Sequence, residues 1–349
     1  MIVTAELVYV CVLCVAGLVT VTGNGVLVYL MCSKRSLRNA SNFYMASMSI
    51  ADTGVGLFVT AAIVVTIMDI PLPVGWCYFS PYFELATLSA GIFSFLLISY
   101  DRHLAVSKAL TYHPTKRSAL TSLAAVWVSA FIYSLRIFIQ YEVAKILKRD
   151  LPPLDGDDDN ITETSNDDNE VEGGFCNVLV EEDYNDLIFR CVDFVILFII
   201  PIVCMSYWYK GIISNLWAGN ITTTSHVRRK RRVIKLLIIN VVVFFVCWIP
   251  FYLSDIISDT HVLVMRLKDP EYDEEASSKE IRLCLIFIAI SHSYLNPIIF
   301  LSFHADFKAE LTSTVICKCA WARRTRTVEP TDQTLRTADQ ADEGLRTIS

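Results

Sequence analysis

Seven long apolar stretches are the feature of this sequence that most constrains its fold. A helix needs about 20 apolar residues to cross about 30 Å of hydrocarbon, and each stretch meets or nearly meets this length. Core helices of soluble proteins rarely run so long, and they rarely follow one another in such a series. The sequence therefore predicts an all-α membrane protein, a bundle of seven transmembrane helices. The predicted spans are Leu7–Met31, Phe43–Met68, Tyr78–Ile98, Leu120–Ile139, Leu187–Tyr209, Val233–Ile257 and Ile281–Phe303.

The composition supports a membrane protein and excludes several other classes. Hydrophobic residues make up 54% of the 349 residues and charged residues only 19%, whereas soluble proteins carry about 25% charged residues. The net charge of -6 argues against a protein that coats nucleic acid. The cysteines are too few for a disulfide scaffold and lack the paired C-x-x-C spacing of a zinc site. We expect no nucleic-acid partner and no cofactor.

Lys and Arg gather in three predicted loops, and short loops rich in these residues stay in the cytoplasm. The basic residues are Lys34, Arg35 and Arg38 after the first span, Lys108, Lys116 and Arg117 after the third, and the run 228–232 with Lys235 at the sixth. This pattern places the N-terminus outside the cell and the C-terminus in the cytoplasm. Residues 141–186 then form an acidic outer loop, and residues 317–349 form a polar, disordered cytoplasmic tail.

Short motifs recur in the spans, and each is weak evidence when taken alone. They are Gly23-Asn24-Gly25-Val26, Ser49-Ile50-Ala51-Asp52, Asp101-Arg102-His103, Trp127, Pro201 with Tyr209, Cys247-Trp248-Ile249-Pro250, and Asn296-Pro297-Ile298-Ile299-Phe300. Together they resemble the class A (rhodopsin-like) G-protein-coupled receptors, over about residues 7–316. The resemblance implies a receptor domain over 1–316 in the plasma membrane, with a short amphipathic eighth helix near Phe307–Leu311 and no enzymatic activity. It also implies a heterotrimeric G protein, arrestin, a receptor kinase and membrane lipid as partners.

The resemblance assigns Asp52 and Asn296 to the family's sodium and water pocket. Gly91 stands where the family usually has a third-helix serine, which argues against sodium at Asp52. Polar groups in the middle of a membrane need partners or water. Each of the two residues could therefore also be a simple hydrogen-bond link between helices.

Prolines inside the spans remove a helix hydrogen bond and can kink a helix. By resemblance, Pro250 acts with Trp248 as the hinge on which the inner half of the sixth helix swings outward. Ile92, Pro201 and Phe244 match the family's packing switch between the third, fifth and sixth helices. The alternatives are a static bend and ordinary core packing.

Two departures from the family pattern concern the inner end. Asp101 can hold Arg102 within its own helix until a transducer binds. Where some members reinforce this lock with an acidic residue on the sixth helix, this chain has Lys230, which predicts raised basal activity. Phe300 replaces the usual tyrosine, so its water-mediated link toward Tyr209 cannot form in the usual way.

Several covalent features follow from the resemblance and from the predicted orientation. Cys77 and Cys176 match the family's disulfide between the third helix and the second outer loop, and an extracellular location permits it. Asn160 lies in an outer-loop glycosylation sequon. Cys317 and Cys319 follow the predicted eighth helix and are candidates for palmitoylation.

Ionisable residues inside spans are the first candidates for a ligand site. Glu84 lies about two turns from the outer end of the third span, where amine receptors carry an aspartate. It predicts a contact with a cationic ligand group, and the alternative is a buried pair with a residue such as Arg136. Asp193 and Asp255 add negative potential to the same half of the bundle. The remaining candidate ligand residues are Leu88, Phe251 and Tyr252.

The acidic loop and the fifth span favour a basic (neuro)peptide as the ligand, although a solvated acidic run is the alternative explanation of the loop. A biogenic amine held by Glu84 is the second hypothesis, but Asp193 stands where amine receptors often keep a hydroxyl. A light sensor needs a lysine in the seventh span, where Ile290 stands instead. A transporter or channel would predict duplicated halves or a pore loop, and the sequence shows neither.

Overall fold

The structure is a computed structural model and describes residues 2–68, 70, 74–108, 111–142, 184–218, 225–268, 277–303 and 307–314. Asn160, Cys176, Cys317 and Cys319 lie outside these residues, as do residues 143–183 of the acidic loop and the tail 317–349. Cys77 is described only as part of a helix, without its side chain. The disulfide, the glycosylation and the palmitoylation therefore stay predictions.

Seven helical segments of the described residues are long and apolar enough to cross a membrane. The elements are α1 (Ile2–Ser33), α2 (Ala40–Ile67), α3 (Val74–Ser107), α4 (Lys116–Ser134), α6 (Tyr184–Phe194), α7 (Ile200–Ala218), α8 (Ser225–Arg266) and α9 (Ser277–Phe303). The five-residue segment η3 (Val195–Ile199) joins α6 to α7 as one span. Residues 136–142 continue beyond α4 as a helix, and residues 307–314 form a short helix after α9. The predicted seven-helix bundle is confirmed, and a short eighth helix is present.

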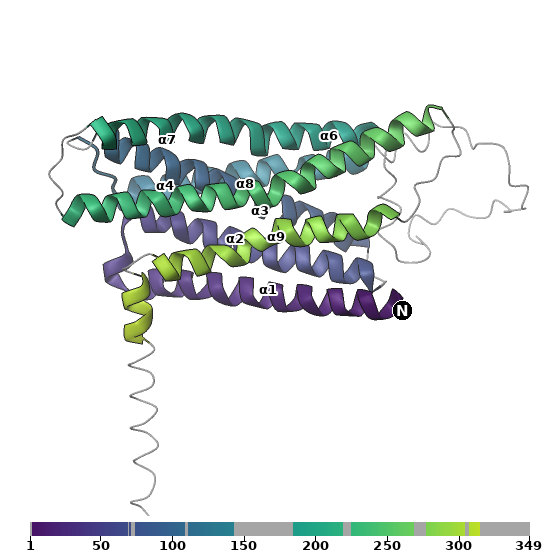
Figure 1. The fold of residues 1–349 in the computed structure, drawn as a ribbon, viewed down its shortest axis with the longest axis horizontal. Coiled ribbons are helices and arrows are strands. Elements are labelled where there is room, and N and C mark those ends of the chain that lie inside the picture. The colour runs from purple at the N-terminus through teal and green to yellow at the C-terminus, as the bar shows by residue number, and fades with distance from the viewer. Residues whose placement is uncertain are drawn as a thin grey trace, which may run out of the picture.

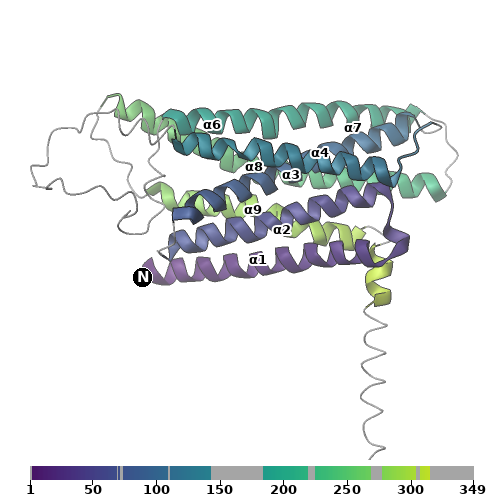
Figure 2. The same cartoon turned by 180° about the vertical axis from the view of Figure 1, so that it is seen from behind.

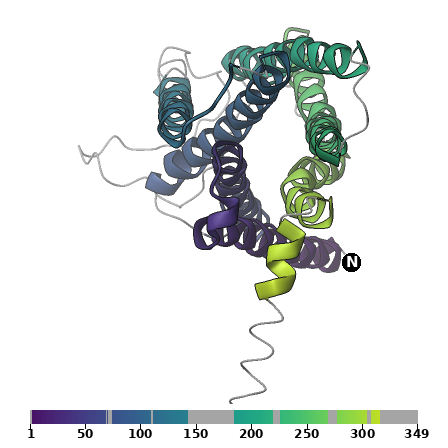
Figure 3. The ribbon, with the colours of Figure 1, turned by 90° about the vertical axis from the view of Figure 1, so that its left-hand side faces the viewer.

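The seven spans stand side by side around a common axis (Figure 3) and alternate in direction along the chain (Figures 1 and 2). The N-terminus lies at one end of the bundle, which is the outer end in the predicted orientation (Figure 1). The helix 307–314 lies across the opposite, inner end, beside the short helix η1 (Arg35–Leu37). Helix α3 packs against α2, α4, α7 and α8, so its residues reach most of the interior.

Side chains fix where two helices begin at the inner end. Asn39 Oδ1 accepts a hydrogen bond of 2.9 Å from the backbone N–H of Asn42, at the start of α2. Thr115 Oγ1 accepts one of 3.2 Å from the N–H of Ser118, at the start of α4. Each bond satisfies a first-turn N–H that has no partner within its helix.

Prolines shape the helices at more positions than the sequence analysis considered. Pro81 lies inside α3, in addition to the expected Pro250 in α8 and Pro297 in α9. The π-helical segment η3 ends two residues before Pro201. A wider turn accommodates the hydrogen bond that proline cannot make. The change of winding in the fifth span therefore lies directly before Pro201.

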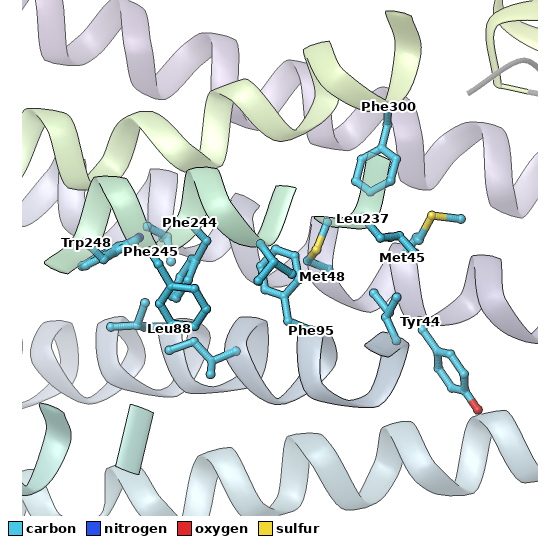
Figure 4. Close-up of a cluster of buried hydrophobic side chains, with 14 of the residues drawn as sticks. Tyr44, Met45, Met48, Leu88, Phe95, Leu237, Phe244, Phe245, Trp248 and Phe300 are labelled. Atoms are coloured by element: carbon cyan, nitrogen blue, oxygen red, sulfur yellow. The ribbon is translucent and has the colours of Figure 1, made fainter. Parts of the chain in front are cut away.

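Aromatic side chains fill the core between the helices (Figure 4). The ring centroid of Phe244 on α8 lies 5.6 Å from the centroid of Phe95 on α3 and 5.8 Å from that of Phe198 in η3. It lies 4.9 Å from the ring centroid of His292 on α9. Ile92 is 1% exposed and belongs to the same cluster. Phe244 thus contacts three neighbouring spans at once, so a rotation of α8 must disturb all three contacts.

Candidate functional site

The predicted ligand residues of α3 and α8 lie in the outer half of the bundle. Leu88 and Tyr252 are each 7% exposed, while Phe251 is partly buried. Glu84 lies on α3 one turn before Leu88 and is partly buried. The described residues provide no hydrogen bond and no ion pair to the Glu84 carboxylate.

The carboxylate of Asp193 on α6 is already paired inside the protein. Arg136, just beyond α4, forms an ion pair with it, and the Tyr133 hydroxyl donates a hydrogen bond to it. Arg136 also donates a hydrogen bond of 2.9 Å to Gln140 Oε1. The alternative that Arg136 neutralises Glu84 is therefore wrong, because the guanidinium points across to α6 rather than to α3. The sequence contains both charged residues of the observed pair, but it does not show at what depth in the bundle each side chain lies.

A second set of charges joins the outer ends of α6, α8 and α9. Arg190 on α6 forms an ion pair with Asp255 of α8, and its Nε lies 2.8 Å from Asp259 Oδ2. Arg282 Nε on α9 lies 3.4 Å from Asp255 Oδ1. The two arginines offset much of the negative potential that the sequence predicted for Asp255. Glu84 is left as the acid of this region to which the described residues supply no base.

Asp52 connects α2 to α9 in the middle of the bundle. Asn296 Nδ2 donates to its Oδ2 at 2.5 Å, and Ser293 Oγ donates to its Oδ1 at 3.2 Å. His292 Nδ1 lies 3.9 Å from Oδ1, an arrangement that the sequence analysis missed. Asn24 Nδ2 on α1 donates to the Ser293 carbonyl at 2.9 Å, so the hydrogen bonds link three helices.

The donor set around Asp52 does not fit a sodium ion. Hard cations prefer several oxygen ligands, but nitrogen atoms, Asn296 Nδ2 and His292 Nδ1, stand beside the two carboxylate oxygens of Asp52. A Cβ at Gly91 would meet the Cβ of Ala51 at 3.6 Å, an ordinary contact. Glycine is therefore not sterically required there, and its effect is to leave the site without a hydroxyl from α3.

The Asp101 carboxylate accepts several hydrogen bonds at the inner end of α3. Its Oδ2 accepts from Arg102 Nη2 at 2.6 Å and from Ser41 Oγ at 3.1 Å, and its Oδ1 accepts from the Tyr112 hydroxyl at 2.7 Å. The expected pairing of Asp101 with Arg102 is present. Ser41 of α2 and Tyr112 of the loop after α3 were not predicted, because the sequence does not show which residues of other segments reach this helix end.

The Tyr209 hydroxyl on α7 has a partner other than the one the family pattern supplies. Ser99 Oγ on α3 donates a hydrogen bond of 3.2 Å to it. Phe300, which is 2% exposed, lies in the core at the inner end of α9 (Figure 4). The link that a tyrosine at position 300 would provide is thus absent, and α3 contacts Tyr209 instead.

Comparisons with known proteins agree with this arrangement. The family model described as 7 transmembrane receptor (rhodopsin family) matches residues 23–300. The tachykinin-like peptides receptor 99D of Drosophila melanogaster is 26% identical over 299 residues, covering 83% of this chain and 53% of that receptor. The RYamide receptor of Drosophila melanogaster is 24% identical, covering 82% and 58%. The allatostatin-A receptor of Bombyx mori is 23% identical, covering 86% and 77%.

The matched region of this chain spans a little more than half the length of the first two of these relatives. It contains every described span from the middle of α1 to the inner part of α9. The similarity therefore covers the part of the chain that holds Glu84, Asp52 and Asp101.

Proposed function

We propose that this chain, which belongs to the rhodopsin family of seven-transmembrane receptors, binds an extracellular basic peptide and activates a heterotrimeric G protein. The single observation that carries the peptide assignment is the similarity to three relatives whose names are those of peptide receptors. The protein is a multi-pass membrane protein. We place it in the plasma membrane with its N-terminus outside.

The unpaired carboxylate of Glu84 is the proposed contact for a cationic group of the ligand. Glu84 is partly buried, and a charge partly removed from water without a partner carries a desolvation cost. A ligand ammonium or guanidinium would offset that cost on binding. Leu88, Phe251 and Tyr252 would contact the apolar part of the same ligand segment. Asp193 and Asp255, which are already paired with arginines, would position the outer ends of the helices and carry little of the ligand's charge.

Binding at the outer half would reach the inner end through α8. Trp248 is 5% exposed and lies two residues before Pro250 within α8. A shift of the ring would move Phe244, whose contacts with α3, η3 and α9 hold the packing switch of Ile92 and Pro201. Release of Arg102 from Asp101 would then expose the inner end of α3 to the G protein.

The other expected features extend this proposal. The receptor domain covers residues 1–316 and the cytoplasmic tail residues 317–349. Arrestin and a receptor kinase are proposed as partners at the inner end, and anionic lipid as the partner of the basic loops. Cys77 with Cys176, Asn160, and Cys317 with Cys319 remain the proposed sites of disulfide formation, glycosylation and palmitoylation.

The function is tested by expressing the full chain in cells and applying a panel of tachykinin-like, RYamide and allatostatin-A peptides, other basic peptides, and biogenic amines. Activation is measured as cAMP and calcium responses. A response to a peptide supports the proposal, a response to amines alone favours the amine alternative, and no response in a surface-expressed receptor contradicts both.

The role of Glu84 is tested with the peptide or amine that responds in this panel. Glu84→Gln removes the charge and should raise the concentration needed for half-maximal response by about tenfold or more, because a charge-assisted contact is lost. Glu142→Gln removes an exposed acid near the same end of the bundle and should change the response little. Equal effects of the two substitutions would reject Glu84 as the contact.

A further inference from the structure

Asn240 is buried in α8, with a relative exposure of 0%. Among the residues that the structure describes, neither its Oδ1 nor its Nδ2 has a hydrogen-bond partner. It lies between Leu237 and Phe244, which face the core from the same helix (Figure 4). A buried amide without a hydrogen bond destabilises the conformation that contains it. The arrangement described here therefore carries a cost at this residue that another position of α8 could relieve.

The register of the two helices places Asn240 level with Asn296. Helices α8 and α9 run in opposite directions (Figures 1 and 2), and the rings of Phe244 and His292 are 4.9 Å apart. Four residues toward the inner end lead from Phe244 to Asn240 on α8 and from His292 to Asn296 on α9. Four residues correspond to about 6 Å along each axis, so both asparagines lie one turn inside the Phe244–His292 contact.

Asn296 offers the hydrogen-bond acceptor that the Asn240 amide lacks. It is 0% exposed, its Nδ2 donates to Asp52, and no described residue donates a hydrogen bond to its Oδ1. The Asn240 amide has two N–H donors, and Asn296 has a free acceptor that is already held in place by Asp52. The two helices thus present a donor and an acceptor, both unsatisfied, at the same level of the core.

We propose that Asn240 Nδ2 donates a hydrogen bond to Asn296 Oδ1 when the inner half of α8 moves, and that this bond stabilises the signalling conformation. The inference rests on the proposed function and adds a positioning residue to it. Asn240 would add a polar contact between α8 and α9 to the inner core. Phe300, on the inner part of α9, offers no hydroxyl for such a contact. The resting arrangement would be disfavoured relative to the moved one, which predicts basal signalling without ligand.

The test uses Asn240→Leu in the full chain, with Asn42→Leu as the matched control. Asn42 is also buried, at 4% exposed, but its Nδ2 donates to the Leu37 carbonyl at 2.8 Å. Asn240→Leu should raise the melting temperature in lipid nanodiscs, because it removes an unsatisfied amide from the resting core. Asn42→Leu should lower the melting temperature, because it removes a satisfied one. Basal G-protein activation should fall about tenfold in Asn240→Leu, a change equivalent to about 1.4 kcal/mol.

A distance measurement separates this inference from the proposed function. Spin labels are introduced at the exposed Lys116 of α4 and Lys235 of α8 through non-natural amino acids, since the native cysteines would otherwise react. Asn240→Leu should shift the distribution of label-to-label distances toward shorter values, because the inner half of α8 would adopt its outward position less often. If this shift and the higher melting temperature occur while no variant activates a G protein, the polar contact is supported and G-protein coupling is contradicted. If neither the distances nor the melting temperature changes as expected, the contact between Asn240 and Asn296 is overturned.

Discussion

Tyr112 is the residue through which the loop after α3 reaches the Asp101 carboxylate, at 2.7 Å. Burial raises the pKa of the Tyr112 hydroxyl, and the bond to Asp101 raises it further. Because the raised pKa favours the protonated hydroxyl, the stabilising bond is fully present below the ordinary tyrosine pKa of about 10. It is lost only as the pH rises through the raised value.

Tyr112→Phe should therefore destabilise the protein by about 1.5 kcal/mol, the contribution of a hydrogen bond to a charged group. The difference in melting temperature between the native chain and the variant should be the same at pH 6 and at pH 9. A difference that shrinks toward pH 9 would mean that the hydroxyl ionises in this range, against the expected direction.

Trp127 shows how far the contacts of a single residue can be predicted from the sequence. The sequence marked it as one of the family's motif residues, and its Nε1 donates to Ser47 Oγ at 3.0 Å, which in turn lies 3.0 Å from Ser94 Oγ. The serine partners were not predicted, because serines in apolar spans are common and most bond to their own helix. For the same reason nothing in the sequence distinguishes Asn240, which has no hydrogen-bond partner among the described residues, from Asn42, which has one. Local composition identifies polar residues, and only the packing determines their partners.

The charges at the outer ends of α6, α8 and α9 act as an inter-helix link that does not depend on apolar packing. Arg190 is the shared base of Asp255 and Asp259, whose side chains are 7% and 4% exposed. Removing one partner of a buried ion pair leaves the other charge uncompensated. Arg190→Ala should therefore lower the stability by about 3 kcal/mol, measured as thermal unfolding in nanodiscs.

Arg282→Ala is the control for this prediction. Arg282 is 45% exposed and lies 3.4 Å from Asp255, so its removal should cost little. Equal losses of stability in the two variants would show that the total charge of the region matters and the Arg190 contacts do not.

The helix 307–314 is tied to the loop after α1 by Glu310. Ser36 Oγ donates to Glu310 Oε1 at 2.7 Å, and Lys34 Nζ lies 3.4 Å from Oε2. The bond from Ser36 and the nearby Lys34 lower the pKa of the Glu310 carboxyl. The contact is thus fully present above the ordinary glutamate pKa of about 4.3 and is lost as the pH falls through the lowered value.

Glu310→Gln should speed hydrogen–deuterium exchange in residues 307–314 without changing the melting temperature of the bundle. In the native chain this exchange, corrected for its intrinsic pH dependence, should keep the same protection between pH 5 and pH 8. Lys308→Gln, which removes an exposed charge from the same helix, should leave the protection unchanged. Faster exchange in both variants would show that the loss of either charged side chain loosens this helix, and it would contradict the role of Ser36 and Lys34.

At the level of elements, apolar length was sufficient to predict all seven spans, because the hydrocarbon thickness sets that length. It did not set the ends. Helix α8 begins at Ser225, eight residues before the predicted Val233, and ends at Arg266 rather than at Ile257, because helical hydrogen bonds continue into polar sequence beyond the apolar core. The π-helical turn before Pro201 was also missed, since a change of winding leaves the apolar pattern almost unaltered.

The whole molecule separates its charges between the two ends of the bundle. Residues 141–190 contain fifteen acidic and four basic residues, while residues 210–235 contain seven basic and no acidic ones. The described ion pairs of Asp193 and Asp255 all lie in the outer half. These ion pairs offset only part of the outer negative charge, so the outer segments stay acidic, whereas the inner basic loops are suited to anionic lipid and to a transducer.

Two of the three sequons in the sequence lie at opposite ends of the bundle and provide a direct test of this orientation. Asn160-Ile161-Thr162 lies in the segment between residues 136–142 and α6, and Asn220-Ile221-Thr222 lies between α7 and α8. Because consecutive spans alternate in direction, these two segments lie on opposite sides of the membrane, and only one of them can enter the lumen where glycans are added. The positive-inside rule assigns the outer side to Asn160. Asn160→Gln should abolish the mobility shift that a glycosidase produces in the native chain, and Asn220→Gln should preserve it. The reverse result would invert the whole bundle, and Glu84 and the outer ion pairs would then face the cytoplasm.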